Sequence, residues 1–182
     1  MSKFRLEERT VIVTGGAGGL GAAMAKACAE AGANVVVASR NKENIDQVAE
    51  EITGNGQTAI ALPVDITDAS QLDDMIAQSV EAFGSVDVIV NSAGRWGKSH
   101  LAEDTPLDEW QQVIELNLTG CFLSCLAAGK QMIKQNHGKI INISSTAGSK
   151  GNPGQLHYSA AKAGVLSLTN NLAFMWAKHN IN

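Results

Sequence analysis

The chain alternates short apolar runs with longer segments of helical periodicity, and this order limits the fold more than any other feature of the sequence. The apolar runs predict five strands, at residues 10–14, 34–39, 58–65, 86–94 (with its turn) and 138–145. Helical patterns lie at residues 21–32, 41–52, 69–84, 106–136 (one bent helix or two successive helices) and 157–179. Parallel strands joined by crossover helices satisfy this order. We therefore expect one α/β domain over residues 1–182, with a doubly wound parallel sheet.

Composition and charge narrow the class of protein. Hydrophobic residues make up 45% of the chain and charged residues 18%, which is ordinary for a soluble globular domain. The formal net charge of −4 offers no basic surface for nucleic acid. No apolar run approaches the ~18 residues that span a bilayer, and residues 1–10 lack the apolar core of a signal peptide. We expect a cytoplasmic protein without a nucleic-acid or membrane partner.

The cysteines and histidines do not predict a metal centre. Cys121 and Cys125 lie four residues apart in an apolar helical pattern, which favours a shared buried face, and Cys28 stands apart from them. The sequence has no CxxC pair, and its histidines do not cluster with the cysteines. We expect neither a metal nor a disulfide.

A glycine-rich turn, "TGGAGGLG" at residues 14–21, joins the first predicted strand to the first predicted helix. Such a turn lets a pyrophosphate approach the backbone, and the helix behind it offers free N–H groups and a positive dipole end. This arrangement is typical of a Rossmann dinucleotide site. The predicted phosphate loop consists of Gly15, Gly16, Ala17, Gly18, Gly19, Leu20 and Gly21.

Three glycine templates fit this loop, and the loop alone leaves them open. TGxxxGxG uses Gly15, Gly19 and Gly21. TGxxGxxG uses Gly15, Gly18 and Gly21, and GxGxxG uses Gly16, Gly18 and Gly21. Of the three, GxGxxG calls for an acidic residue about 20 positions further along the chain.

The end of the second predicted strand favours NADP(H) as the cofactor. Ser39 and Arg40 stand where a GxGxxG protein carries its ribose-binding acid. A guanidinium beside a hydroxyl suits a ribose 2′-phosphate, because Arg forms charge-assisted pairs with phosphate oxygens. The alternative is that Ser39 or Asn41 only caps the next helix and that Arg40 is solvated. We expect NADP, with NAD as the less favoured cofactor.

Tyr158 is the only tyrosine of the chain, and Lys162 follows it by four residues. In a helix this spacing puts both side chains on one face. A phenol is a poor base at neutral pH unless a neighbouring positive charge stabilises the phenolate, and Lys162 supplies such a charge. Tyr158 would then be a general acid for carbonyl reduction and a general base for alcohol oxidation. The alternative is an ordinary surface pair on an amphipathic helix.

Ser145 ends the fifth predicted strand, at the edge where parallel sheets bind ligands. Its hydroxyl could hydrogen-bond a substrate oxygen and stabilise the charge that develops there, and Ser144 is the weaker candidate.

Four segments together resemble the short-chain dehydrogenase/reductase family. They are "TGGAGGLG" at 14–21, "NSAG" at 91–94, Ser145, and "YSAAK" at 158–162. The resemblance runs from about residue 6 to the end. Within the family the chain looks most like the 3-oxoacyl-[acyl-carrier-protein] reductase type and the related sugar and polyol dehydrogenases. It implies the TGxxxGxG register of the loop.

The resemblance implies catalytic roles for Ser145, Tyr158 and Lys162. The family places its catalytic Ser 13 residues before the Tyr, and 158 − 145 gives that spacing. Asn117 matches the fourth catalytic residue, which is implied to hold a water near the Lys and extend a proton relay. An Asn at this place could also kink a helix by bonding its own backbone.

The resemblance also implies cofactor contacts. Asp65 matches the acid that contacts the adenine, although it could also cap the next helix. In the usual turn two asparagines precede Ala-Gly, and here the shorter Ser92 replaces the second asparagine, which weakens the expected strut contacts between the central strands. Apart from the loop and strand-end residues already named, the implied cofactor contacts are Asp65, Ile66, Asn91, Ala93, Gly94, Tyr158 and Lys162.

The implied activity is the reversible reduction of a ketone or 3-oxo group to a secondary alcohol with NADPH. A sugar or polyol dehydrogenase is the alternative enzyme, and a non-catalytic nucleotide-binding sensor is the alternative from another class. The helical segments 106–136 and 157–179 have wide apolar faces, which by resemblance suggest a homo-oligomer, a dimer or a tetramer.

The family normally continues beyond the last helix found here. Residues 180–182 look like the approach to a sixth strand. A sheet that ended at its fifth strand would expose an apolar edge. We expect this sequence to be a partial record of a longer protein, and we expect the piece alone to be poorly soluble and inactive.

Overall fold

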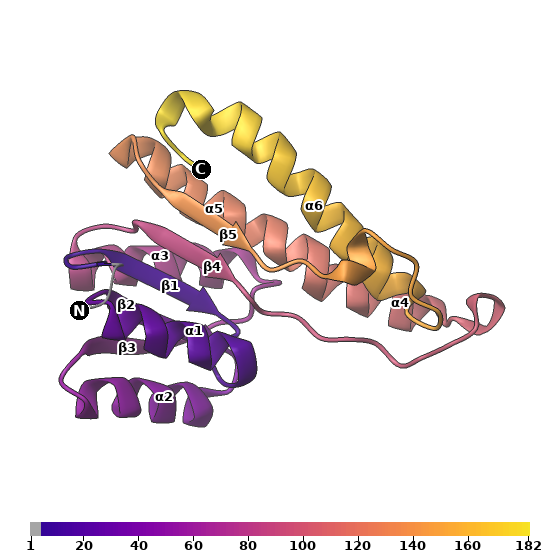
Figure 1. The fold of residues 1–182 in the computed structure, drawn as a ribbon, viewed down its shortest axis with the longest axis horizontal. Helices are drawn as coiled ribbons and strands as arrows, with labels where there is room; N and C mark the ends of the chain where they lie inside the picture. Colours follow the sequence, from indigo (N-terminus) through magenta and orange to yellow (C-terminus); the bar gives the residue numbers. More distant parts are fainter. Residues whose placement is uncertain (1–4) are drawn as a thin grey trace.

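The protein, described by a computed structural model over residues 5–182, is built on a five-stranded parallel sheet (Figure 1). The strand order β3-β2-β1-β4-β5 places the first strand at the centre, so the chain reverses its direction of winding there. This confirms the predicted doubly wound fold. The strands are β1 (Thr10–Thr14), β2 (Asn34–Ser39), β3 (Thr58–Pro63), β4 (Val88–Asn91) and β5 (Lys139–Asn142).

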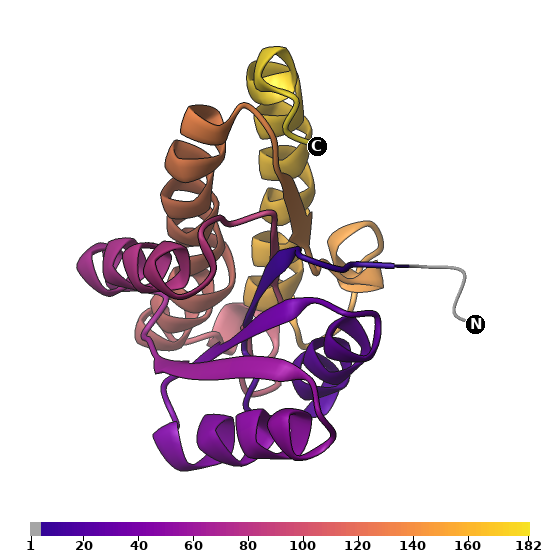
Figure 2. The ribbon, with the colours of Figure 1, turned by 90° about the vertical axis from the view of Figure 1, so that its left-hand side faces the viewer.

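Helices cover both faces of the sheet (Figure 2). Helices α1 and α2 pack on β1, β2 and β3, whereas α3 packs on β1 and α5 on β4 and β5, with α6 beside α5. Each face has its own apolar cluster, because alternate residues of a strand point to opposite faces. The helices are α1 (Gly19–Glu30), α2 (Lys42–Gly54), α3 (Ala69–Phe83), α4 (Leu107–Ile114), α5 (Gly120–Gln135) and α6 (Leu156–Trp176).

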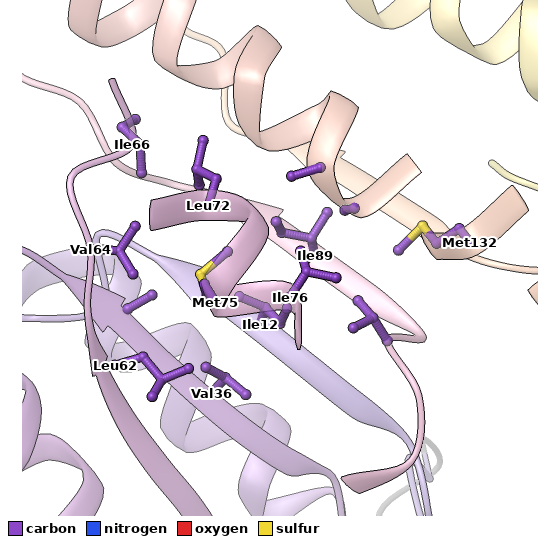
Figure 3. Close-up of a cluster of buried hydrophobic side chains, with 14 of the residues drawn as sticks. Ile12, Val36, Leu62, Val64, Ile66, Leu72, Met75, Ile76, Ile89 and Met132 are labelled. Atoms are coloured by element: carbon purple, nitrogen blue, oxygen red, sulfur yellow. The ribbon is translucent and has the colours of Figure 1, made fainter. Parts of the chain in front are cut away.

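The larger apolar cluster lies between the sheet and the helices α3 and α5. Ile12 and Ile89 come from the central strands, Met75 from α3 and Met132 from α5, and all four are fully buried (Figure 3). This packing fixes the relative positions of the strands whose carboxyl ends carry the predicted site residues.

Two capping residues explain where α2 and α3 begin. The Asn41 side chain accepts a hydrogen bond from the Asn44 N–H, and Asp68 accepts from the N–H groups of Ser70 and Gln71. Asn41 is therefore a cap, as one alternative for this segment had it, while Asp65 is not the cap of α3.

The helical segment 106–136 contains a wide turn rather than a simple bend. The π-helical residues Glu115–Thr119 join α4 to α5. The whole run Leu107–Gln135 is long and apolar enough to cross a membrane by length and composition, but half of its most apolar window is buried in the fold. This is weak evidence for a membrane span, since core helices of soluble proteins pass the same test.

The two edge strands of the sheet, β3 and β5, are both partly exposed. Strand β3 is exposed at its two ends, and β5 leaves Ile141 47% exposed. Near the end of the chain, Ile181 forms a parallel bridge with Gly138. This bridge agrees with the expected approach to a sixth strand.

At the amino ends of β1, β4 and β5, a buried carboxylate holds the strands together. Asp87 accepts hydrogen bonds from the Thr10 N–H (3.0 Å), Ser85 Oγ (2.7 Å) and Arg9 Nη1 (2.9 Å), and His137 Nε2 lies 3.2 Å away. Burial alone raises the pKa of Asp87, but these hydrogen bonds outweigh burial and hold the pKa below its usual value. We call these five residues the amino-end cluster.

Candidate active site

The glycine turn after β1 has a conformation and a closeness of packing that side chains would disturb. Gly15 and Gly19 have positive φ angles of 70° and 53°. A Cβ on Gly15 would lie 2.7 Å from the Ala93 Cα, and a Cβ on Gly21 would lie 2.2 Å from the Gly15 carbonyl oxygen. Gly18 and Gly19 have open space around the position of a Cβ. The backbone of the turn is therefore bare on the side that a phosphate would approach.

The amino terminus of α1 is electrostatically free to receive an anion. Its N-cap, Gly18, provides no side-chain hydrogen bond, and no acidic residue lies in the first turn. The first N–H groups of a helix lack intrahelical partners and carry a partial positive charge. Such a helix end can bind an anion such as the pyrophosphate of a dinucleotide.

A cavity of about 520 Å³ lies between the glycine turn, the turn after β4, and the amino-terminal part of α6. Its walls bring together most of the residues that the sequence predicts to act on a cofactor or substrate: Gly15, Gly18, Gly19, Leu20, Gly21, Ala93, Gly94, Asn117, Ser145, Tyr158 and Lys162.

Tyr158 and Lys162 lie on the same side of α6 and face this cavity. The Lys162 Nζ atom is 5.6 Å from the centre of the Tyr158 ring. It donates a hydrogen bond to the Ile143 carbonyl oxygen at 2.8 Å, and this bond fixes the ammonium at the carboxyl end of β5. The pair is therefore oriented by the sheet and does not form an ordinary surface pair.

The Lys162 side chain is only 5% exposed, and burial lowers the pKa of its ammonium group below the usual value. The nearby thiol of Cys121 acts in the opposite direction and is the weaker influence. A buried ammonium beside a phenol interacts with it through a medium of low dielectric constant, where charge–charge interactions are stronger than in water.

Ser145 and Ser144 have different surroundings. The Ser144 hydroxyl donates to the Lys162 carbonyl oxygen at 2.9 Å and so ties β5 to α6. The Ser145 Oγ atom accepts from the Ala147 N–H at 3.1 Å, which leaves its hydroxyl hydrogen available to a ligand in the cavity. This difference favours Ser145 as the group that meets a substrate.

Asn117 lies in the π-helical turn, and the contacts of its side chain bear on both interpretations made from the sequence. Its Nδ2 group donates to the carbonyl oxygens of Val113 and Arg95, each at 2.9 Å, so it does bond its own helix. Its Oδ1 atom is buried and has no partner among the described residues. A Cβ placed on Gly94 would lie 2.6 Å from this Oδ1 and 3.6 Å from the Lys162 Nζ, so both atoms border the same space.

The turn after β4 is held by the hydroxyl of Thr14. The backbone N–H groups of Ser92 and Ala93 donate to Thr14 Oγ1 at 3.2 and 3.4 Å. This contact joins β1 to β4 and involves the backbone of Ser92, so the serine in place of asparagine does not interrupt it.

A second cavity, of about 230 Å³, adjoins the first on the side of β2 and β3. It is lined by Gly15, Ser39, Arg40, Asp65, Ile66, Ala93 and Gly94, among others. The Arg40 Nη1 atom lies 3.7 Å from the Asp65 Oδ2, and the guanidinium is 66% exposed. Hydrogen bonds from Thr67 lower the pKa of Asp65 most, and Arg40 lowers it further against the effect of burial.

Comparison with known proteins identifies the family of the chain. Residues 9–182 match the family model described as short chain dehydrogenase. The chain belongs to the short-chain dehydrogenase family.

Individual relatives agree. The chain is 43% identical to a 3-oxoacyl-[acyl-carrier-protein] reductase of Synechocystis over 174 residues, which cover 92% of the chain and 68% of that protein. It is 37% identical to an NAD-dependent glycerol dehydrogenase of Listeria innocua, over 98% of the chain and 69% of that protein. The crystal structure of an NAD⁺-bound xylitol dehydrogenase superimposes with a TM-score of 0.95 at 31% identity, covering 97% of the chain and 68% of that structure.

Membership of the short-chain dehydrogenase family confirms the resemblance seen in the sequence and implies a nicotinamide cofactor. The structure fits such a cofactor, because the bare glycine backbone and uncapped helix lie at one end of the cavity and Tyr158 and Lys162 at the other. When bound, a nicotinamide supplies or accepts the hydride, and the protein supplies placement and charge. The protein is an NAD(P)-dependent oxidoreductase.

Three predicted cofactor residues of this dehydrogenase line neither cavity. The Gly16 N–H donates to the Ala38 carbonyl oxygen at 3.1 Å, and Ala17 packs against the apolar cluster under α1. Asn91 is buried at the end of β4 and bonds the Asn142 side chain. These three residues instead bond or pack against the neighbouring strands and α1, next to the residues that line the cavities.

Trp96 also lines the cofactor cavity of this dehydrogenase, although no sequence motif assigns it a role. The Trp96 ring stacks on Tyr158, with 5.9 Å between the ring centres and 8° between the planes. The loop that carries Trp96 is held to α4, because Glu109 accepts from the Lys98 N–H and Arg95 donates to Gln112. Trp96 follows the "NSAG" turn directly after Arg95, so nearness to that turn was the available signal. Among residues 5–182, no group of His, Cys, Asp and Glu is placed to hold a metal ion.

Proposed function

We propose that this dehydrogenase reversibly reduces a ketone or 3-oxo group to a secondary alcohol with NADPH, through Ser145, Tyr158, Lys162 and Asn117. One observation carries the proposal. The hydroxyls of Ser145 and Tyr158 and the ammonium of Lys162 line the cavity that begins at the glycine turn. A cofactor extended from that turn would bring its reactive ring to these groups.

The proposed roles follow from the available hydrogens. Ser145 donates a hydrogen bond to the carbonyl oxygen of the substrate and stabilises its developing negative charge. Tyr158 gives its phenolic proton to the same oxygen, and the ammonium of Lys162 stabilises the phenolate that remains. The unpartnered Asn117 Oδ1 accepts from a water that can return a proton to the Lys162 side of the site.

The substrate would approach from the side of Trp96. A third cavity, of about 370 Å³, is lined by Trp96, Ser145 and Tyr158 together with residues 146–152. Because Ser145 and Tyr158 line both this cavity and the cofactor cavity, a carbonyl group held between them would meet both partners. The exposed Trp96 ring offers an apolar surface to the remainder of the substrate.

The preference for NADPH rests on Arg40 and Ser39. Both line the second cavity, and because Asn41 is the cap of α2, the Ser39 hydroxyl does not serve as that cap. Asp65 near the guanidinium opposes an anionic phosphate, which makes the preference moderate. The relatives named above include NAD-dependent and NAD⁺-bound enzymes, so NAD is the competing cofactor.

The favoured substrate class is a 3-oxoacyl thioester, by similarity to the Synechocystis reductase. Sugars and polyols are the second candidate, supported by the glycerol and xylitol dehydrogenases among the relatives. We also propose a homo-oligomer, since Phe174 and Met175 near the end of α6 are 89% and 59% exposed. The cytoplasmic location stays a prediction.

The test is a substrate panel of 3-oxoacyl thioesters, ketoses and simple ketones, assayed with NADPH and NADH. Tyr158→Phe should lose at least about a hundredfold in kcat/KM on any active substrate, because it removes the proton donor. It should bind NADPH almost as tightly as the parent. Turnover that survives in Tyr158→Phe would refute the mechanism, and a tenfold preference for NADH would refute the cofactor assignment.

A further inference from the structure

A chain of side-chain hydrogen bonds connects the sheet to α6 behind the active site. Asn142, the last residue of β5, accepts a hydrogen bond on Oδ1 from Asn91 Nδ2 of β4 at 2.8 Å. Its Nδ2 group donates to Thr169 Oγ1 of α6 at 2.9 Å. Thr169 in turn donates to the Val165 carbonyl oxygen one turn earlier, at 2.8 Å. One half-buried amide therefore touches two adjacent strands and the helix that carries Tyr158.

The direction of these hydrogen bonds is determined by Thr169. A hydroxyl has a single hydrogen, and the hydrogen of Thr169 goes to the Val165 carbonyl. Its oxygen must then accept from the Asn142 amide, which turns the Asn142 carbonyl toward Asn91. An aspartate or a leucine at position 142 could not make both contacts. This series of hydrogen bonds therefore needs an amide at position 142, because an amide is both a donor and an acceptor.

Helix α5 completes the surroundings of the same amide. The Sγ atoms of Cys121 and Cys125 both lie 3.4 Å from Asn142 Oδ1, and Asn91 Nδ2 also donates to Cys125 Sγ at 3.3 Å. Both cysteines are buried, and neither forms a disulfide. Elements β4, β5, α5 and α6 thus meet at one polar point inside an otherwise apolar region.

The next two residues of the chain hold the catalytic end of α6. The Ile143 carbonyl accepts from Lys162 Nζ at 2.8 Å, and Ser144 donates to the Lys162 carbonyl at 2.9 Å. Thr169 lies about two helical turns beyond Lys162, on the same face. The segment 142–144 therefore hydrogen-bonds α6 at Lys162 and at Thr169. A shift of the helix along its axis at Thr169 would move Lys162 and Tyr158 with it.

We propose that Asn142 is a positioning residue that sets the axial position of α6, and so the placement of Tyr158 and Lys162 against Ser145. This inference rests on the proposed function, because it assumes that Tyr158 and Lys162 carry the proton transfer. Asn142 touches neither cavity wall and takes no part in the chemistry. It acts through Thr169 and through the neighbouring Ile143 carbonyl.

The experiment compares Thr169→Val, which removes the hydroxyl but keeps the shape, with Thr169→Ser, which keeps the hydroxyl. Asn142→Ala breaks the chain at its centre, and Ser167→Ala, at an exposed position of the same helix, controls for general effects on α6. Each variant is measured for kcat, KM and thermal unfolding. Because Tyr158 is the only tyrosine, its rate of acetylation by N-acetylimidazole, a phenol-selective reagent, reports its accessibility without any need for turnover.

Thr169→Val and Asn142→Ala should lower kcat about tenfold with KM nearly unchanged, less than the ~hundredfold cost of a 1 Å misplacement. N-acetylimidazole should acetylate Tyr158 at least about twofold faster in these variants, because a displaced phenol no longer stacks on the Trp96 ring. Thr169→Ser and Ser167→Ala should match the parent in both measurements.

A lower unfolding temperature with an unchanged kcat and an unchanged acetylation rate of Tyr158 would overturn the inference, because these hydrogen bonds would then only add stability. If the parent turned over no carbonyl substrate with either cofactor, the proposed function would fail instead. The acetylation rate of Tyr158 in Thr169→Val would still decide the inference in that case.

Discussion

The two ends of the sheet both bury polar side chains, but their strongest acceptors differ. At the amino end, both carboxylate oxygens of Asp87 accept hydrogen bonds from the amino-end cluster, although the Thr10 hydroxyl in that cluster is buried without a partner in the described part of the chain. At the carboxyl end, Asn117 Oδ1 and Asn91 Oδ1 are buried without a partner among residues 5–182. Buried polar groups normally have partners, and an unpartnered one costs stability.

This difference separates a structural polar cluster from a functional one. A carboxylate whose two oxygens already accept hydrogen bonds, as in Asp87, stabilises the fold and has little left to offer a ligand. A site with unused buried acceptors lowers the stability of the fold. A ligand or water that donates hydrogen bonds to those acceptors restores the stability. The comparison predicts that substitutions at the amino end change stability and leave turnover intact, while substitutions at the carboxyl end do the reverse.

The largest expected effect is that of Lys162→Met. It should lower kcat/KM by about two to four orders of magnitude, because the phenolate loses its stabilising charge. The unfolding temperature should stay the same or rise, since burial already lowers the pKa of this ammonium and the charge is costly to bury. The matched control is Lys139→Met, at the amino end of β5, where the side chain bonds Asn182. Steady-state kinetics and thermal melts measure both variants. If Lys139→Met lowered kcat/KM as much as Lys162→Met, the proposed difference between the two ends of the sheet would be wrong.

Asp87→Ala should have the next largest effect. It leaves the Thr10 N–H and the Ser85 hydroxyl without their acceptor, which should cost about 2 kcal/mol in the free energy of unfolding. Turnover at temperatures below the melt should remain within about twofold of the parent. Urea unfolding followed by fluorescence measures the loss, and a large fall in kcat of the folded variant would contradict a purely structural role.

Arg40→Ala should change the choice of cofactor. We expect the KM for NADPH to rise about tenfold while the KM for NADH changes little, because one exposed charge-assisted contact to the 2′-phosphate is lost. Arg9→Ala, which removes the exposed cation of the amino-end cluster, is the control and should leave both KM values unaltered. Equal changes for the two cofactors would show that Arg40 does not read the 2′-phosphate.

The smallest expected effect is on the stability of the protein at acidic pH. Because the pKa of Asp87 is lower in the folded protein than in the unfolded chain, this carboxylate stabilises the fold at pH values above its unfolded pKa of about 4. That contribution is lost as the pH falls through the folded value. Stability measured between about pH 6 and pH 2 should therefore decline less steeply in Asp87→Asn than in the parent. Parallel curves for the two proteins would remove Asp87 from the acid response.

The sequence was sufficient for the parts of the molecule governed by periodicity and by local motifs. The alternation of apolar runs predicted all five strands, and "TGGAGGLG" and "YSAAK" indicated the cavity that the structure forms around them. Periodicity carries little information about the length of an element, so β4 and β5 proved shorter than the runs that predicted them.

What the sequence could not supply were contacts between distant residues. In the sequence, Asn142 lies within the predicted strand 138–145 and Thr169 within the predicted helix 157–179, and no local motif marks either residue. Their hydrogen bond spans 27 positions and exists only because β5 and α6 pack together. The Trp96 stack on Tyr158 depends in the same way on how a loop returns to the helix.

The wide turn at Glu115–Thr119 has a consequence for anyone who edits this chain. A π-helical turn holds about one residue more than an α-helical turn, so it absorbs one extra residue between α4 and α5. Deleting one residue there would restore a regular helix and displace Asn117, whose amide donates to the Arg95 carbonyl oxygen. The helix would be more regular, yet the backbone next to Trp96 would lose the hydrogen bond that holds it.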